Sequence, residues 1–127
     1  MTRALRLIWI AALDAVIVGS VLPAQSAAMS LIDRAGINDE VEHFTAYAIL
    51  AALASLDRFR CRRLSATIAF LFLLGTLLEL AQLFSPGRTC DWRDLLADSC
   101  GILTGVVLVR ISTLAFRLRF SPAPPAN

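Results

Sequence analysis

Four runs of apolar residues, each about as long as a membrane is thick, dominate this chain. They cover residues 5–22, 43–59, 64–84 and 95–116. An α-helix rises about 1.5 Å per residue, so about 20 apolar residues cross the roughly 30 Å hydrocarbon core of a bilayer. A spanning helix also satisfies its own backbone hydrogen bonds, which lipid cannot do. The sequence therefore predicts an all-α fold, an integral membrane bundle of four transmembrane helices.

The composition favours the same class. Of the 127 residues, 57% are hydrophobic and 17% are charged, which is more apolar and less charged than is usual for a soluble domain. The predicted domain is 1–120, followed by a disordered Pro-rich tail over 121–127. A nucleic-acid partner is not expected, because the basic residues form no face of a soluble fold. The first run is too long for a signal-peptide core, and Asp14 interrupts it, so cleavage is not expected.

The arginines predict the orientation of the helices. They gather at 3–6, at 58–63 and at 110–119, which are alternate ends of the four runs. The segments 24–42 and 85–94 are acidic or balanced in charge. Because cytoplasmic loops of membrane proteins carry the excess of basic residues, we expect both termini and the 58–63 loop in the cytoplasm. The other two loops then lie outside.

Polar side chains gather near the outer ends of three of the expected helices. Glu79 and Gln82 share one face by their i,i+3 spacing, and His43 and Tyr47 share another by their i,i+4 spacing. The fourth expected helix carries a stripe of three acids at i, i+3 and i+7, which are Asp91, Asp94 and Asp98. An ionised carboxylate inside a span costs about 2.5–3.5 kcal/mol on insertion scales, so we expect Glu79 to face the bundle interior. The sequence predicts an outward-open polar pocket.

The counter-charge expected for Glu79 is Arg88 in the adjoining loop, with Arg93 as a second candidate. Other roles for these polar residues stay open. Asp91 or Asp94 is also suited to capping a helix, and Glu79 with Gln82 to hydrogen bonding between helices. The mid-span Asp14 is suited either to pairing inside the bundle or to handling protons.

Several other residue types have structural interpretations. Trp9 and Trp92 fit the aromatic belts at the two membrane surfaces. Gly101 and Gly105 form a small-xxx-small pair, which lets another helix approach closely. The three cysteines, Cys61, Cys90 and Cys100, are odd in number and widely spaced, so neither a disulfide framework nor a zinc site is predicted.

Two blocks of the chain resemble the VanZ-like family of small membrane proteins. Asn-Asp-Glu-Val-Glu-His-Phe-Thr-Ala-Tyr, residues 38–47, resembles the start of the family's second helix. The second block consists of Glu79, Gln82, Pro86, Arg88, Asp91, Asp94, Gly101 and Gly105. Two positions depart from the family pattern: Glu40 replaces a usual Lys and Asp98 a usual Asn, and both changes add negative charge. The resemblance implies a multi-pass protein of the bacterial cytoplasmic membrane, with a link to glycopeptide (teicoplanin) resistance.

Two classes of function follow. In the first, the pocket binds an envelope lipid, such as a polyprenyl-linked precursor, or a lipid-anchored ligand. The ligand-binding candidates are Asp39, His43, Tyr47, Glu79, Gln82, Arg88, Asp91, Asp94 and Asp98. In the second, the chain is a membrane enzyme acting on a lipid-linked substrate, with acid–base candidates Glu79, His43 and Asp94, unaided or with a divalent cation.

The binding class is favoured, because no recognisable catalytic motif is present. The sequence leaves open whether the chain is an enzyme. A proton-coupled transporter using Asp14 and Glu79 is a weaker third hypothesis. No cofactor and no metal site are predicted. The expected partners are membrane lipids, and a homo-oligomer is an open alternative.

Overall fold

The structure of the protein is a computed structural model that describes residues 3–34, 36, 38–56 and 61–120. These residues form an all-helical fold, and no strand occurs among them. The five helices are α1 (Arg3–Val21), α2 (Ala27–Arg34), α3 (Asp39–Leu56), α4 (Cys61–Gln82) and α5 (Trp92–Arg119). The last part of the expected second span, 57–59, and the expected disordered tail, 121–127, lie outside the described residues.

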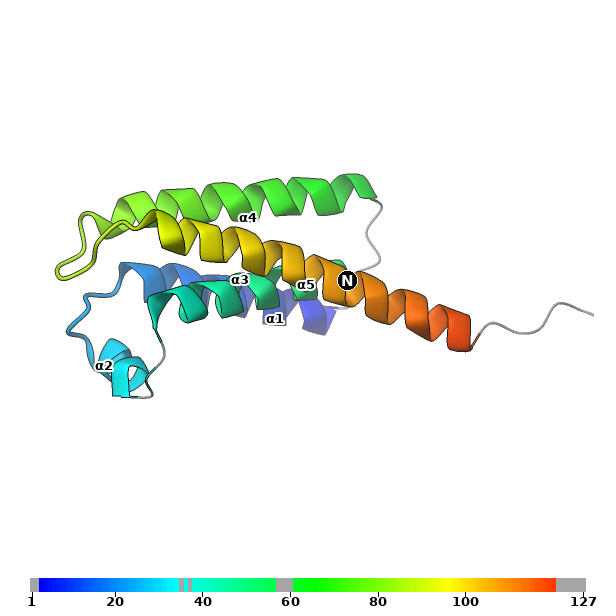
Figure 1. Ribbon diagram of the computed structural model, residues 1–127, viewed down its shortest axis with the longest axis horizontal. Helices are drawn as coiled ribbons and strands as arrows, with labels where there is room; N and C mark the ends of the chain where they lie inside the picture. Colours follow the sequence, from blue (N-terminus) through cyan, green and yellow to red (C-terminus); the bar gives the residue numbers. More distant parts are fainter. Residues whose placement is uncertain (1–2, 35, 37, 57–60, 121–127) are drawn as a thin grey trace, which may run out of the picture.

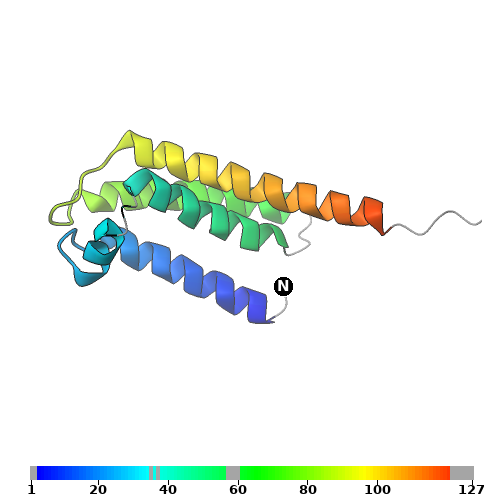
Figure 2. The same cartoon turned by 60° about the horizontal axis from the view of Figure 1, so that its bottom comes forward.

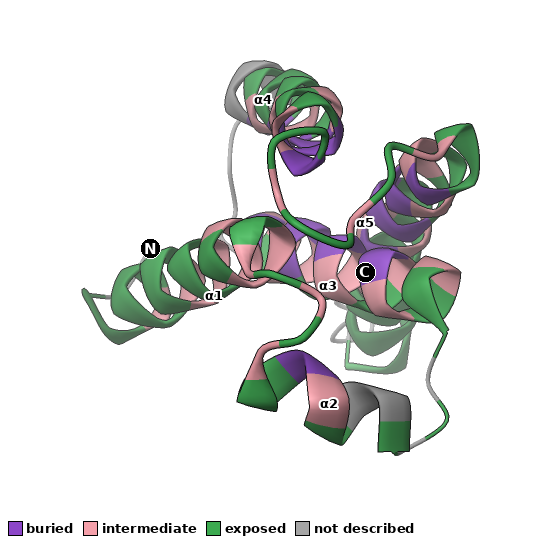
Figure 3. Cartoon of the chain, turned by 90° about the vertical axis from the view of Figure 1, so that its left-hand side faces the viewer, coloured by how far each residue is buried: buried purple, intermediate pink, exposed green. Residues whose placement is uncertain are grey.

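The four long helices lie side by side, and the short α2 lies across one end of the bundle (Figures 1 and 2). Seen end-on, α3 occupies the middle, between α1, α4 and α5 (Figure 3). The segment expected as a plain loop between the first two spans therefore contains a helix, which begins after the hydrogen bond from the Ser26 amide to the Pro23 carbonyl. Of the described α2 side chains, that of Met29 is buried.

The closest helix contact joins α3 to α5, and glycine makes it possible. A Cβ atom on Gly101 would collide with the backbone of Phe44 and Ala48, and one on Gly105 with the backbone of Ala48 and Ala52. Only residues without a side chain let two backbones come this near. The predicted role of the small-xxx-small pair is confirmed.

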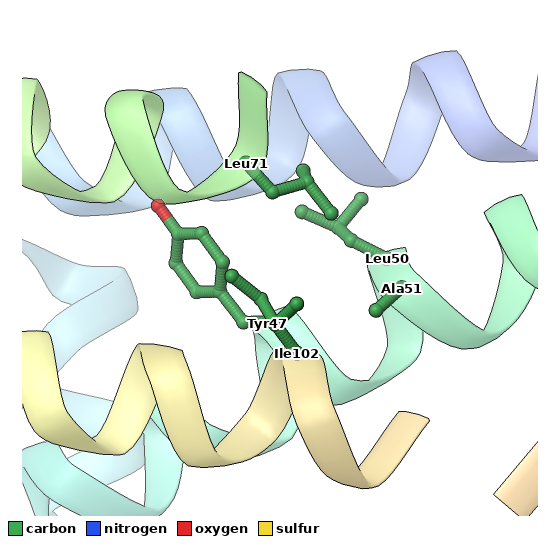
Figure 4. Packing of buried hydrophobic residues seen from close by; sticks show 5 residues of the cluster. All are labelled: Tyr47, Leu50, Ala51, Leu71 and Ile102. Atoms are coloured by element: carbon green, nitrogen blue, oxygen red, sulfur yellow. The ribbon is translucent and has the colours of Figure 1, made fainter. Parts of the chain in front are cut away.

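The apolar core lies where α3 meets its neighbours. Figure 4 shows its buried members, which are Tyr47, Leu50, Ala51, Leu71 and Ile102. Trp9 of α1 packs against this core and donates its indole N–H to the Leu50 carbonyl at 3.1 Å. It therefore forms a contact between helices, and its expected place in an aromatic belt stays a prediction. Trp92, by contrast, is exposed at the start of α5.

The outer faces of the helices are strongly apolar. Exposed large apolar side chains occur on every long helix. Among the described residues, three helices are long and apolar enough to cross a membrane: α1, the 64–82 part of α4, and α5. The chain is therefore a multi-pass membrane protein. α3 has 18 residues but carries three acids in its first turn, so the fourth crossing stays a prediction.

Candidate functional site

The polar residues predicted to share one depth meet at one end of the bundle. The start of α3, the end of α4 and the start of α5 all lie there, because α4 runs antiparallel to both partners (Figure 1). The buried polar side chains at this end are His43, Glu79, Gln82, Asp94 and Asp98, with the buried Tyr47 one helical turn below His43. The sequence placed Glu79 toward the interior, and it is only 3% exposed.

His43 lies between two carboxylates. Its Nδ1 is 2.9 Å from Asp98 Oδ1, and its Nε2 is 3.7 Å from Glu79 Oε1. When Asp98 is ionised, its carboxylate can only accept a hydrogen bond, and Nδ1 is then the donor. This fixes the plane of the imidazole ring and turns Nε2 toward Glu79.

Gly75 of α4 makes room for the side chains of Asp98 and Tyr47. A Cβ atom at that position would lie 2.5 Å from Asp98 Oδ2 and 3.2 Å from the Tyr47 hydroxyl oxygen. Asp98 and Tyr47 therefore reach the α4 backbone only because residue 75 has no side chain. Sequence reasoning missed this residue. Its spacing of four residues from Glu79, on the same helical face, was the available signal.

The loop between α4 and α5 holds Glu79 in place. The Oε2 atom of Glu79 accepts a hydrogen bond from the backbone N–H of Asp91 at 3.2 Å. The Asp91 side chain is the N-cap of α5 and accepts from the Arg93 N–H at 3.0 Å. Of the two roles open for Asp91, the structure supports capping, which typically contributes about 1 kcal/mol.

Arg88 does not pair with Glu79, which corrects the expectation from the sequence. Gly87, with φ of 78°, shapes the turn that carries Arg88 away from α4 and toward α1 and α2. There its Nη1 lies 3.5 Å from Asp39 Oδ1, and its Nη2 contacts the Gly19 carbonyl oxygen at 3.4 Å. The same Nη2 lies 2.9 Å from the sulfur of Met29. The second candidate, Arg93, is exposed on α5.

A cavity of about 190 Å³ connects Arg88 to His43. It lies between α1 and α3. Its lining residues are Ala15, Val16, Gly19, Ser20, Glu42, His43, Ala46, Tyr47 and Arg88. The α1 side of this lining and Glu42 were missed by sequence reasoning, because nothing in a single apolar helix indicates which of its faces borders a space.

Two predicted residues lie away from the buried cluster. The side chain of Asp39 is 63% exposed and lies at the rim, where it meets Arg88. Asp14 is exposed on α1. The cluster itself offers three types of chemistry: proton exchange between His43 and a carboxylate, hydrogen bonding to a polar group, and ligation of a cation. For the last, one ligand atom each from His43, Glu79 and Asp94 lies within 4.8 Å of the others.

The comparisons with known proteins identify the chain at the family level. No curated protein matches it, and no solved structure matches it. The model of the VanZ/LLP1 family matches residues 14–114, which contain the whole polar cluster and the four long helices apart from the first turns of α1 and the end of α5. The chain therefore belongs to the VanZ/LLP1 family.

Proposed function

We propose that this protein crosses the bacterial cytoplasmic membrane four times and binds a polyprenyl-phosphate-type envelope lipid in a pocket open to the outside. Both termini lie in the cytoplasm. The observation that carries the proposal is the cavity between α1 and α3, which combines an apolar wall with an arginine at its polar end. Capture of such a lipid is the route by which a protein of this type would affect the action of a glycopeptide such as teicoplanin.

The lining of the cavity suits a lipid. Small and apolar side chains of α1 and α3 form one part, including Ala15, Val16 and Ala46. His43, Tyr47 and Arg88 form the other. An apolar pocket with a few convergent polar groups is the usual form of a ligand site. The first part suits the beginning of a prenyl chain, and the second suits a phosphate.

Arg88 is the group that would meet the phosphate. Its side chain is only 9% exposed, yet its one ion-pair partner among the described residues is the largely exposed Asp39, 3.5 Å away. Its buried Nε has no hydrogen-bond partner within the part of the chain that the structure describes. Asp39 is largely in contact with water, so it can remain hydrated when a phosphate takes its place beside Arg88. Guanidinium also binds phosphate in a bidentate manner.

The bundle geometry supports the four-crossing topology. The arginine-bearing ends of α1 and α5 lie at one end of the bundle, and the acidic start of α3 lies at the other (Figure 1). α3 is about 27 Å long and runs among the other three long helices (Figure 3). Its acidic first turn therefore fits the outer surface, and its remainder fits the membrane.

Thiol labelling tests this orientation. Cys90 is exposed in the loop between α4 and α5, whereas Cys61 lies among arginines at 60–63. In single-cysteine variants, with the other cysteines changed to serine, we expect a membrane-impermeant maleimide to label Cys90 in intact cells. Cys61 should react only after lysis. Labelling of Cys61 in intact cells would reverse the orientation.

Lipid binding is tested with Arg88→Gln. A hydrogen bond to a charged group contributes about 1.5–3 kcal/mol, so this variant should bind undecaprenyl phosphate about 10–100-fold more weakly than the wild type. Arg93→Gln, which removes an exposed arginine five residues away, should bind as the wild type does. Native mass spectrometry of protein in nanodiscs measures both affinities. Equal affinity for undecaprenol, which has no phosphate, would refute the proposal.

The second candidate function is a membrane enzyme acting on a lipid-linked substrate. It is favoured by the placement of His43 between Asp98 and Glu79, which suits a general acid–base group. The same incubations distinguish it, since mass spectrometry follows the lipid as well as the complex. We expect binding without turnover. A lipid product in molar excess over protein, lost in Glu79→Gln and His43→Ala, would establish the enzyme instead.

A further inference from the structure

We propose that His43, Glu79 and Asp94 form a binding site for a divalent first-row transition-metal ion such as Zn²⁺ or Mn²⁺. One ligand atom from each residue lies within 4.8 Å of the others, and the three residues come from α3, α4 and α5. This site goes beyond the lipid-binding proposal and does not depend on it. From the sequence, a divalent cation at these three residues is only an alternative within the enzyme hypothesis, and no metal site is predicted.

The hydrogen bond to Asp98 prepares His43 as a ligand. With the proton on Nδ1, directed at Asp98 Oδ1 2.9 Å away, the lone pair of Nε2 points toward Glu79. Metal-binding histidines characteristically donate their other ring N–H to a carboxylate in this way. Two ligands that bind one ion at about 2.1 Å are about 3.4 Å apart at the tetrahedral angle. The observed Nε2 to Glu79 Oε1 distance, 3.7 Å, is close to that.

The two carboxylate oxygens of Glu79 differ in their contacts. Its Oε2 is held by the Asp91 backbone N–H, but its Oε1 is buried and has no hydrogen-bond partner among the described residues. The Tyr47 hydroxyl, Gln82 Nε2 and Asp98 Oδ2 are also buried without a partner in this described part of the chain. Buried polar atoms are almost always satisfied. Glu79 Oε1 lies beside His43 Nε2, and a cation bound between them would supply the missing interaction.

The cluster contains more acidic groups than basic ones, which favours binding of a cation. Glu79, Asp94 and Asp98 bring three carboxylates to a single imidazole, and all are buried. Among the described residues, no arginine forms an ion pair with any of these three acids, because Arg88 pairs with Asp39. Within a membrane, uncompensated carboxylates are costly. A divalent ion would compensate two negative charges.

The ligand set indicates the class of metal. One imidazole nitrogen and two carboxylate oxygens suit zinc and manganese, whereas calcium and magnesium prefer oxygen ligands alone. The cysteines described, Cys90 and Cys100, are exposed and lie outside the group. Three protein ligands leave at least one coordination position for water or for an oxygen of a ligand.

The test uses tag-free, detergent-purified protein, stripped with a chelator and without added lipid. After Mn²⁺ or Zn²⁺ is added back and the excess is removed, we expect elemental analysis to find one equivalent of the metal per chain. Mg²⁺ should not compete for the site. Since His43 is the only histidine, pulsed EPR of the Mn²⁺ form should show coupling to one imidazole nitrogen. Folded wild-type protein that binds no metal would refute the site, since protons would then compensate the carboxylates. Bound Mn²⁺ without nitrogen coupling would refute it as well.

Variants locate the site. Removing a metal ligand costs more than removing its hydrogen-bond partner, which costs about 10–100-fold in affinity. Glu79→Gln and Asp94→Asn should therefore weaken metal binding by more than about 100-fold, and Asp98→Asn by about 10–100-fold. Asp14→Asn, which changes an exposed acid on α1 away from the group, should bind as the wild type does. Unchanged affinity in folded Glu79→Gln and Asp94→Asn would refute the site. If these variants do not fold, the wild-type EPR spectrum decides alone.

Discussion

Replacing Gly105 with valine is expected to separate α3 from α5 and to destabilise the bundle by about 3 kcal/mol or more. The first added carbon would already collide with the Ala48 carbonyl oxygen and lie 2.9 Å from the Ala52 nitrogen. Both are backbone atoms of a helix, so no side-chain rotation can make room. Thermal unfolding in detergent, or resistance to a steric trap in bicelles, measures the loss.

The matched control is Gly19→Ala. Gly19 also lies within a long helix, but a Cβ atom there would meet nothing within 4 Å. Because alanine favours the helix over glycine by about 1 kcal/mol, this variant should be as stable as the wild type or more stable. Equal stability of Gly105→Val and the wild type would show that α3 and α5 do not pack through their glycines.

Replacing His43 with leucine is the second change with a large expected effect. Asp98 would lose its imidazole hydrogen-bond partner while staying buried, and leaving a buried polar group unsatisfied costs about 1–3 kcal/mol, or more for a charged group. The change should appear as a fall in the free energy of unfolding in detergent, measured on chelator-treated protein so that metal binding does not contribute.

Asp39→Asn provides the comparison for His43→Leu. It removes the ion pair with Arg88, in which the Asp39 side chain is 63% exposed. Because Asp39 is largely exposed and Arg88 keeps its contacts with the Gly19 carbonyl oxygen and the Met29 sulfur, the loss of stability should be smaller than in His43→Leu. Similar losses in the two variants would mean that the His43 pair is not buried away from water in the membrane-embedded protein.

The amino-acid sequence by itself determined the four long helices and the faces on which their polar residues lie. The lengths of the apolar runs decide that the chain folds as helices for a membrane, and helical spacing decides that His43 and Tyr47, or Glu79 and Gln82, share a face. The cost of a carboxylate in lipid then turns Glu79 inward, where the structure places it. These inferences hold because each concerns a single helix, or a single helix and the lipid or water around it.

Only the tertiary structure decided which polar groups meet. The contact of His43 with Asp98 depends on how α3 and α5 are rotated about their axes, and Gly101 and Gly105 set that rotation through backbone contacts. Arg88 reaches Asp39 rather than Glu79 because a turn in the loop directs it toward α1. Spacing along the chain fixes depth and face within a helix, but side-chain packing and loop conformation fix the rotation of each helix against the next.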